Sequence, residues 1–150
     1  MSKRKLFLYT GLILFCISFF LKAAIIDSPT PNDLTGYEAF LYSTFLNFDD
    51  GEGFNLEIFR LKILGYSNLL IVISFFLRNS SLKIRTGMLI ITYAAILLQF
   101  SFVISSFTNE DFGIALKIGF YVWLASYCFI SISHIDFTKV GLFMKKSNEA

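Results

Sequence analysis

Side chains able to do chemistry are few in this chain, and the most notable are four cations near the ends of long apolar segments. They are Lys22, Arg60, Lys62 and Lys117. A cation at the boundary of an apolar layer can help to hold an anion, or it can extend toward water and pair with nearby carboxylates. Two interpretations therefore stay open, a basic anion-binding pocket and a set of ion pairs.

Two amides and one indole lie deeper within the apolar segments. Asn68 and Gln99 need hydrogen-bond partners, which neighbouring helices supply when a segment is surrounded by hydrocarbon. The indole N–H of Trp123 needs a buried acceptor for the same reason. We expect these three side chains to join helices, with a polar pathway shared by Asn68, Gln99 and Lys117 as the alternative.

A pair of small residues, Ala115 and Gly119, is spaced one turn apart in the last apolar segment. Small residues at this spacing let two helix backbones approach closely. The pair predicts tight helix packing, either inside one chain or between two copies.

The residue types that build catalytic and metal sites are scarce. His134 is the single histidine, and Cys16 and Cys128 both fall inside apolar segments, so neither a zinc site nor a disulfide framework is indicated. The acidic residues of segment 49–52 lack the alternating ligand spacing of a calcium-binding EF-hand loop. No phosphate-binding glycine loop or nucleophile–base set is present. We expect no enzyme, no cofactor, no metal and no nucleic-acid partner.

Four long apolar segments must position these side chains. The chain of 150 residues is 55% hydrophobic and 16% charged, whereas soluble domains average about 25% charged residues. Roughly 20 apolar residues suffice for a helix to cross a bilayer. The segments predict an all-α membrane protein, a four-transmembrane-helix bundle that forms one integral domain over residues 1–150, with spans over residues 6–26, 57–77, 87–107 and 112–135.

Charges between the segments are sorted by sign. Three stretches are basic: residues 3–5, 78–85 and 139–146. The other two links carry the acidic residues of 27–57 and 110–111. Basic loops stay in the cytoplasm, so four crossings with both termini inside account for the whole pattern. Lys22 stands where a signal-peptide cleavage site would need a small residue, so we expect the first helix to be retained.

The long acidic link contains a helix start. Thr35 and Glu38 have the spacing of a capping box, in which each side chain accepts a hydrogen bond from the other residue's backbone amide. This predicts an extracytoplasmic helix over residues 36–47, amphipathic and aromatic on one face, at the outer membrane interface.

Two segments resemble those of a family. In a broad group of small, uncharacterised four-helix bacterial membrane proteins, the second span carries Trp-Leu-Ala-Asn-Pro and the last carries Gly-Tyr-Tyr-Leu-Trp-Leu followed by Ser. Here the segments are Gly65-Tyr66-Ser67-Asn68-Leu69, which keeps the Asn and lacks the Pro, and Gly119-Phe120-Tyr121-Val122-Trp123-Leu124-Ala125-Ser126. The resemblance over residues 36–133 implies a four-helix membrane bundle of bacterial origin and brings no biochemical activity with it. We expect an integral protein of the inner membrane.

Two classes of function follow. The first is a non-catalytic membrane subunit, scaffold or immunity-type protein, which acts through a membrane-protein partner or a second copy of itself. The second is a small transporter, channel or lipid- or anion-binding protein with an outward-facing basic pocket, which needs Asn68, Gln99 and Lys117 to meet at one cavity.

Overall fold

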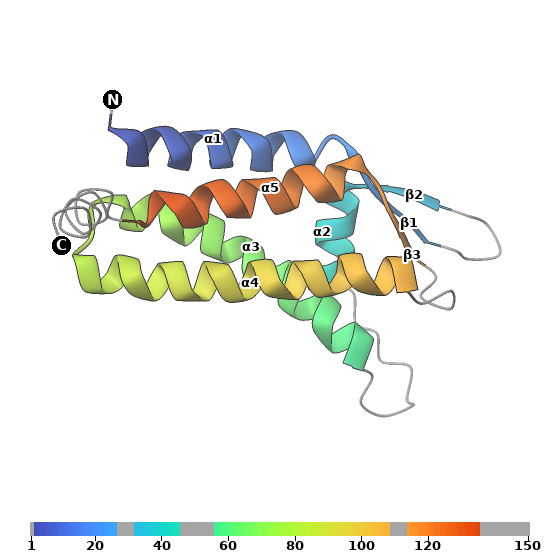
Figure 1. Ribbon diagram of the computed structural model, residues 1–150. Coiled ribbons are helices and arrows are strands. Elements are labelled where there is room, and N and C mark those ends of the chain that lie inside the picture. Colours follow the sequence, from blue (N-terminus) through green and yellow to red (C-terminus); the bar gives the residue numbers. More distant parts are fainter. Residues whose placement is uncertain (1, 27–31, 46–55, 109–113, 136–150) are drawn as a thin grey trace, which may run out of the picture.

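The protein is mostly helical and carries a small antiparallel sheet at one end (Figure 1). The computed structural model describes residues 2–26, 32–45, 56–108 and 114–135. Its elements are α1 (Lys3–Ser18), β1 (Lys22–Ile26), β2 (Asn32–Thr35), α2 (Gly36–Phe45), α3 (Leu56–Phe76), the short 3₁₀ helix η1 (Leu77–Asn79), α4 (Leu82–Thr108), β3 (Ile114–Leu116) and α5 (Ile118–Ser133).

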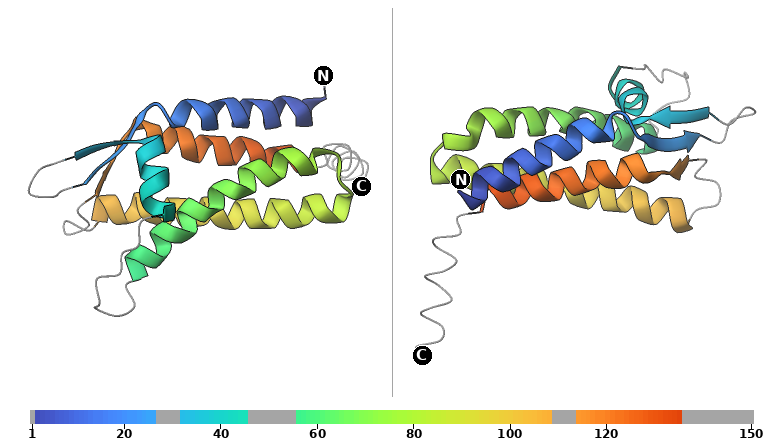
Figure 2. Two further views of the ribbon diagram at one scale, coloured as in Figure 1. Left: turned by 180° about the vertical axis from the view of Figure 1, so that it is seen from behind. Right: turned by 90° about the horizontal axis from the view of Figure 1, so that it is seen from above.

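The long helices α1, α3, α4 and α5 extend along the protein, with α3 inclined to the others (Figures 1 and 2). The sheet and α2 lie at one end, which we call the sheet end. Residues 2–5, 77–85 and 131–135 lie at the opposite end, which we call the basic end. Successive long helices therefore run in opposite directions.

The sheet has the strand order β2-β1-β3, and both of its pairings are antiparallel. Ile25 on the central strand faces Asp33 on one side and Ala115 on the other. The sheet thus joins the segment that follows α1 to the segment that precedes α5.

The first predicted span, residues 6–26, is wrong in its second half. The helix ends at Ser18, and residues 22–26 form β1. Carbonyl groups near a helix end need outside donors. Here the N–H of Tyr37 donates to the Phe19 carbonyl at 3.1 Å and the N–H of Gly36 to the Leu21 carbonyl at 2.9 Å. A Cβ on Gly36 would overlap the Ser18 carbonyl, so this junction between α1 and α2 requires glycine.

The last predicted span, residues 112–135, is also too long. β3 occupies Ile114–Leu116, and α5 begins only at Ile118. Ala115 and Gly119 therefore belong to different elements and form no helix-packing pair. Gly119 still lies at a close contact, because a Cβ there would be 2.7 Å from the Lys22 carbonyl oxygen.

Tight helix packing occurs instead between α1 and α5, at Gly11. A Cβ on Gly11 would lie 2.6 Å from the Ile130 side chain and 3.0 Å from the Ser126 carbonyl oxygen. Leu8, Tyr127 and Ile130 bury their side chains around this contact, together with Ile71 of α3.

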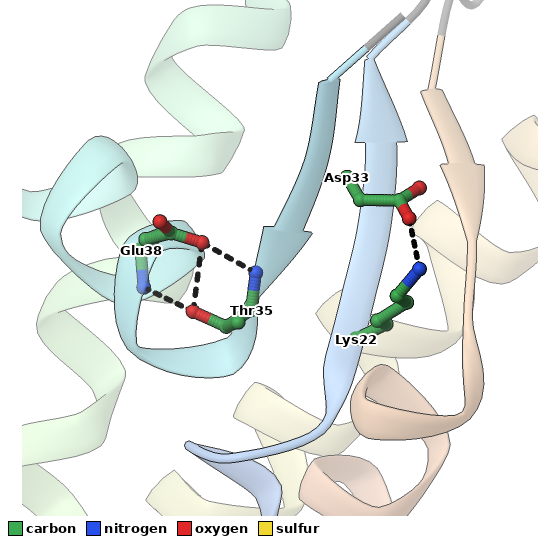
Figure 3. A network of polar contacts seen from close by, with 4 residues as sticks. All are labelled: Lys22, Asp33, Thr35 and Glu38. Atoms are coloured by element: carbon green, nitrogen blue, oxygen red, sulfur yellow. Dashed lines mark hydrogen bonds and ion pairs between the residues drawn. The ribbon is translucent and has the colours of Figure 1, made fainter.

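The predicted capping box is present at the start of α2 (Figure 3). The Thr35 N–H donates to the Glu38 carboxylate at 2.8 Å, and the Glu38 N–H donates to the Thr35 hydroxyl at 3.3 Å. The helix is described as far as Phe45, so the predicted end near residue 47 lies outside the described residues.

Among the residues that the structure describes, two helices are long and apolar enough to cross a membrane. They contain Phe59–Phe76 in α3 and Leu82–Thr108 in α4, and they agree with the predicted spans 57–77 and 87–107. The apolar helix α5 is shorter, and α1 has 16 residues, so neither reaches the same length.

Candidate functional site

A cavity of about 240 Å³ lies at the sheet end. Its wall combines the end of α1, the sheet, α2 and the adjoining parts of α3, α4 and α5. The side chains on it are overwhelmingly apolar, as at Leu34, Phe40, Leu64, Phe102 and Phe120. Ligand cavities are typically apolar with a few placed polar groups, so this one suits a hydrophobic chain.

Asn68 is the amide on the wall, and its hydrogen bonds lie within the protein. The indole N–H of Trp123 donates to the Asn68 side-chain oxygen at 2.8 Å, and the Asn68 amide nitrogen donates to the Gly65 carbonyl at 2.9 Å. Asn68 is therefore the acceptor for the indole N–H of Trp123, and Trp123 is one of the partners that the Asn68 amide needs. Because the two groups satisfy each other, the cavity wall stays apolar where they meet it.

Tyr127 extends this polar contact between α3 and α5. Its hydroxyl lies 2.7 Å from the Ser67 hydroxyl and 3.5 Å from the Asn68 oxygen. The Tyr127 side chain is fully buried. The role of Tyr127 was not predicted from the sequence, although Trp123 and Tyr127 are one turn apart on α5 and face the adjacent pair Ser67 and Asn68.

The four predicted cations do not line the cavity. Lys22, on β1, forms an ion pair with Asp33 on β2, and both side chains are exposed (Figure 3). Arg60 donates to the Ser101 hydroxyl at 2.6 Å and lies 4.8 Å from the centre of the Phe102 ring. Both contacts turn its guanidinium toward α4 rather than toward the other cations.

Lys117 and Lys62 are half-buried. Lys117 lies between β3 and α5, not within a helix, and its N–H donates to the Ala23 carbonyl at 2.8 Å. The carboxylates expected beside it, Glu110 and Asp111, lie outside the described residues. The basic pocket expected at this end thus differs from the cavity found there, which is apolar.

Gln99 is fully buried, and its side-chain amide has no hydrogen-bond partner within the described part of the chain. Asn68 lines the cavity, whereas Gln99 and Lys117 do not. The structure therefore does not bring these three residues together at one cavity. Gln99 belongs to a buried face of α4 that also holds Arg85 and Thr92 at intervals of seven residues. That spacing is visible in the sequence and could have identified the face.

Glu38, at the sheet end, has a lowered pKa. The Thr35 backbone N–H, and then the Thr35 hydroxyl, stabilise the carboxylate and lower its pKa below the ordinary value of 4.5. The carboxylate is therefore charged at neutral pH and lies at the N-terminus of α2, where the helix dipole favours negative charge.

Clusters of three or more His, Cys, Asp or Glu side chains do not occur among the residues described. The chain matches no protein-family model, and searches of curated proteins and of solved structures also find no match.

Proposed function

We propose that this chain is a non-catalytic integral membrane protein that binds the apolar chain of a lipid or lipid-like molecule at its sheet end. The single observation that carries the binding function is the apolar cavity of about 240 Å³. In this proposal the four long helices form a transmembrane bundle in the inner membrane of a bacterium, both termini are cytoplasmic, and the sheet faces outward.

The distribution of polarity supports the membrane location. Large apolar side chains point away from the protein on α3 and α4, for example Phe76, Leu97 and Phe107, which are 75%, 53% and 77% exposed. The polar side chains of Thr92 and Gln99 are fully buried. Soluble proteins bury apolar groups and expose polar ones, whereas polar residues of membrane helices face the interior of the bundle.

Charge supports the orientation. Lys5 and Lys83 are exposed at the basic end, while Asp33 and Glu38 are exposed at the sheet end. Positively charged segments stay in the cytoplasm. The 16 residues of α1 span only about 24 Å, less than the roughly 30 Å of a hydrocarbon core, so we propose that the sheet end reaches into the outer interface.

Trp123 makes the cavity testable, because it is the chain's single tryptophan and it lines the wall. Dibromostearate bound in the cavity would quench its fluorescence. We expect saturable quenching in the purified protein, and we expect Ala39→Phe, which fills the cavity from α2, to weaken binding about tenfold or more. Ala94→Phe makes the same change at an exposed position on α4 and should leave binding unchanged.

Equal quenching in Ala39→Phe and Ala94→Phe would overturn the proposal, because the fatty acid would then act from outside the cavity. The role expected first from the sequence, that of a membrane subunit, scaffold or immunity-type protein, stays a prediction. Affinity purification in mild detergent with mass spectrometry tests it, through a protein partner that stays bound.

A further inference from the structure

A second, smaller pocket lies at the basic end, on the opposite side of the protein from the apolar cavity. Its volume is about 50 Å³, and it lies between the start of α1, the end of α3 with η1, and the end of α5. The polar residues that line it are Ser2, Arg4, Lys5, Ser74, Asn79, Ser133 and His134. A single water needs only about 10–15 Å³ of such space, so the pocket has room for a larger polar group.

The charge around this pocket is positive. Both Arg4 and Lys5 line it. Where the structure describes acidic side chains, at Asp33 and Glu38, they belong to the sheet end. An anion would therefore meet converging cations at the basic end.

Hydrogen bonds hold the wall of the pocket in place. The Arg4 Nε donates to the Ser133 carbonyl at 3.1 Å, which fixes its guanidinium between α1 and α5. His134 is 4% exposed, and its Nε2 lies 3.1 Å from the Ser74 hydroxyl, which joins α5 to α3. The side chains that face the pocket are thus positioned by the same contacts that pack the helices.

The N-terminus of α1 also favours an anion in this pocket. Ser2 is its N-cap, and the Ser2 hydroxyl accepts from the Lys5 N–H at 3.4 Å. The N-terminus of a 16-residue helix carries a partial positive charge. Cations and hydrogen-bond donors therefore approach from three elements on different sides, an arrangement that can meet several oxygens of a tetrahedral phosphate group at once.

We propose that this pocket binds a phosphate group, supplied either by the headgroup of an anionic phospholipid or by free phosphate. The site is independent of the apolar cavity, because the two pockets share no residue and lie at opposite ends. Quenching of Trp123 tests the cavity alone, so failure of one proposal is distinguishable from failure of the other.

Lys5→Gln is the test variant, because Lys5 is exposed and lines the pocket. Lys3→Gln is its control, since it removes the same charge from an exposed position on the same turn but outside the pocket. One arm measures binding of inorganic phosphate to the purified protein by calorimetry. The other measures retention of short-chain phosphatidylglycerol, against phosphatidylcholine, by native mass spectrometry.

We expect Lys5→Gln to weaken binding in at least one arm by about tenfold, and Lys3→Gln to bind as the unchanged protein does. Saturable phosphate binding assigns the pocket to free phosphate, and preferential retention of phosphatidylglycerol alone assigns it to a lipid headgroup. Equal losses in Lys5→Gln and Lys3→Gln, or binding in neither arm, would overturn the proposal.

Discussion

Asn68 and Gln99 look alike in the sequence, as single amides within apolar segments, and the structure treats them differently. Asn68 exchanges hydrogen bonds with Trp123 and with its own helix, while both polar atoms of Gln99 are buried without a partner in the described residues. The need of each amide for a partner was predictable from residue type. Which one is satisfied depends on the approach of α5 to α3, and no local pattern encodes that distance.

Replacing Gln99 by Met should stabilise the protein. Met has nearly the same shape and brings no unpaired polar atom, so we expect the free energy of unfolding to rise by about 1–2 kcal/mol. Unfolding by SDS in mixed micelles measures it.

Asn68→Leu is the contrasting variant. It leaves the indole N–H of Trp123 without its acceptor, and we expect a loss of about 1–3 kcal/mol in the same titration. A loss of stability in Gln99→Met would contradict the view that Gln99 is an unsatisfied amide.

At the scale of elements, the capping box was predictable because all its atoms come from four consecutive residues. The prediction that follows concerns pH. The folded-state pKa of Glu38 is lowered, so its carboxylate stabilises α2 above its ordinary pKa of 4.5, and this contribution disappears as the pH falls through the lower folded-state value. We expect Glu38→Gln to be less stable than the unchanged protein at neutral pH. Its stability should also lack the loss that the unchanged protein shows on acidification, as thermal unfolding measured from neutral to acidic pH would show.

Thr35→Ala supplies the control for this prediction, because it removes the Thr35 hydroxyl and leaves the Thr35 backbone N–H as a donor to the Glu38 carboxylate. The effect of Glu38→Gln should shrink in the Thr35→Ala background, as a double-mutant cycle would reveal. An undiminished effect would mean that Glu38 acts through something other than the capping box.

The strands were not predictable in the same way. The run Lys22–Ile26 is short and apolar, and such a run can extend a helix or form a strand. Its state is decided by pairing with Ile114–Leu116, which is remote in the sequence. The same pairing leaves Lys117 before the start of α5, outside the predicted helix. It also places the sheet on the cavity wall, beside the end of α1 and parts of α2, α3, α4 and α5. The four predicted cations do not line this cavity, because cations that lie near the same boundary in sequence need not converge in space.

At the scale of the whole molecule, the proposed four crossings predict which ends are accessible from each side of the membrane. A reporter fused after Lys146 should be active only in the cytoplasm. In a background with Cys16 and Cys128 replaced, Tyr37→Cys should react with a membrane-impermeant maleimide in spheroplasts, since Tyr37 is 55% exposed at the sheet end. Lys83→Cys, exposed at the basic end, should react only after lysis.

Labelling of Tyr37→Cys and Lys83→Cys from the same side would break the four-crossing arrangement, because α3 lies between them in the chain. Labelling of Lys83→Cys alone in spheroplasts would invert the orientation. Neither outcome would change the two pockets of the fold. Inversion would exchange the compartments from which they are reached, whereas labelling from the same side would place both ends in one compartment.

The central position of β1 has a consequence for how the chain is made. α1 and β1 are synthesised before β3 and α5, yet β1 pairs with β3 and α1 packs most extensively against α5. Until then the nascent chain carries one open strand edge and an unfilled groove at Gly11. Assembly therefore finishes only when the final helix docks, and a chain that stops before residue 114 would leave the first helix without its main partner.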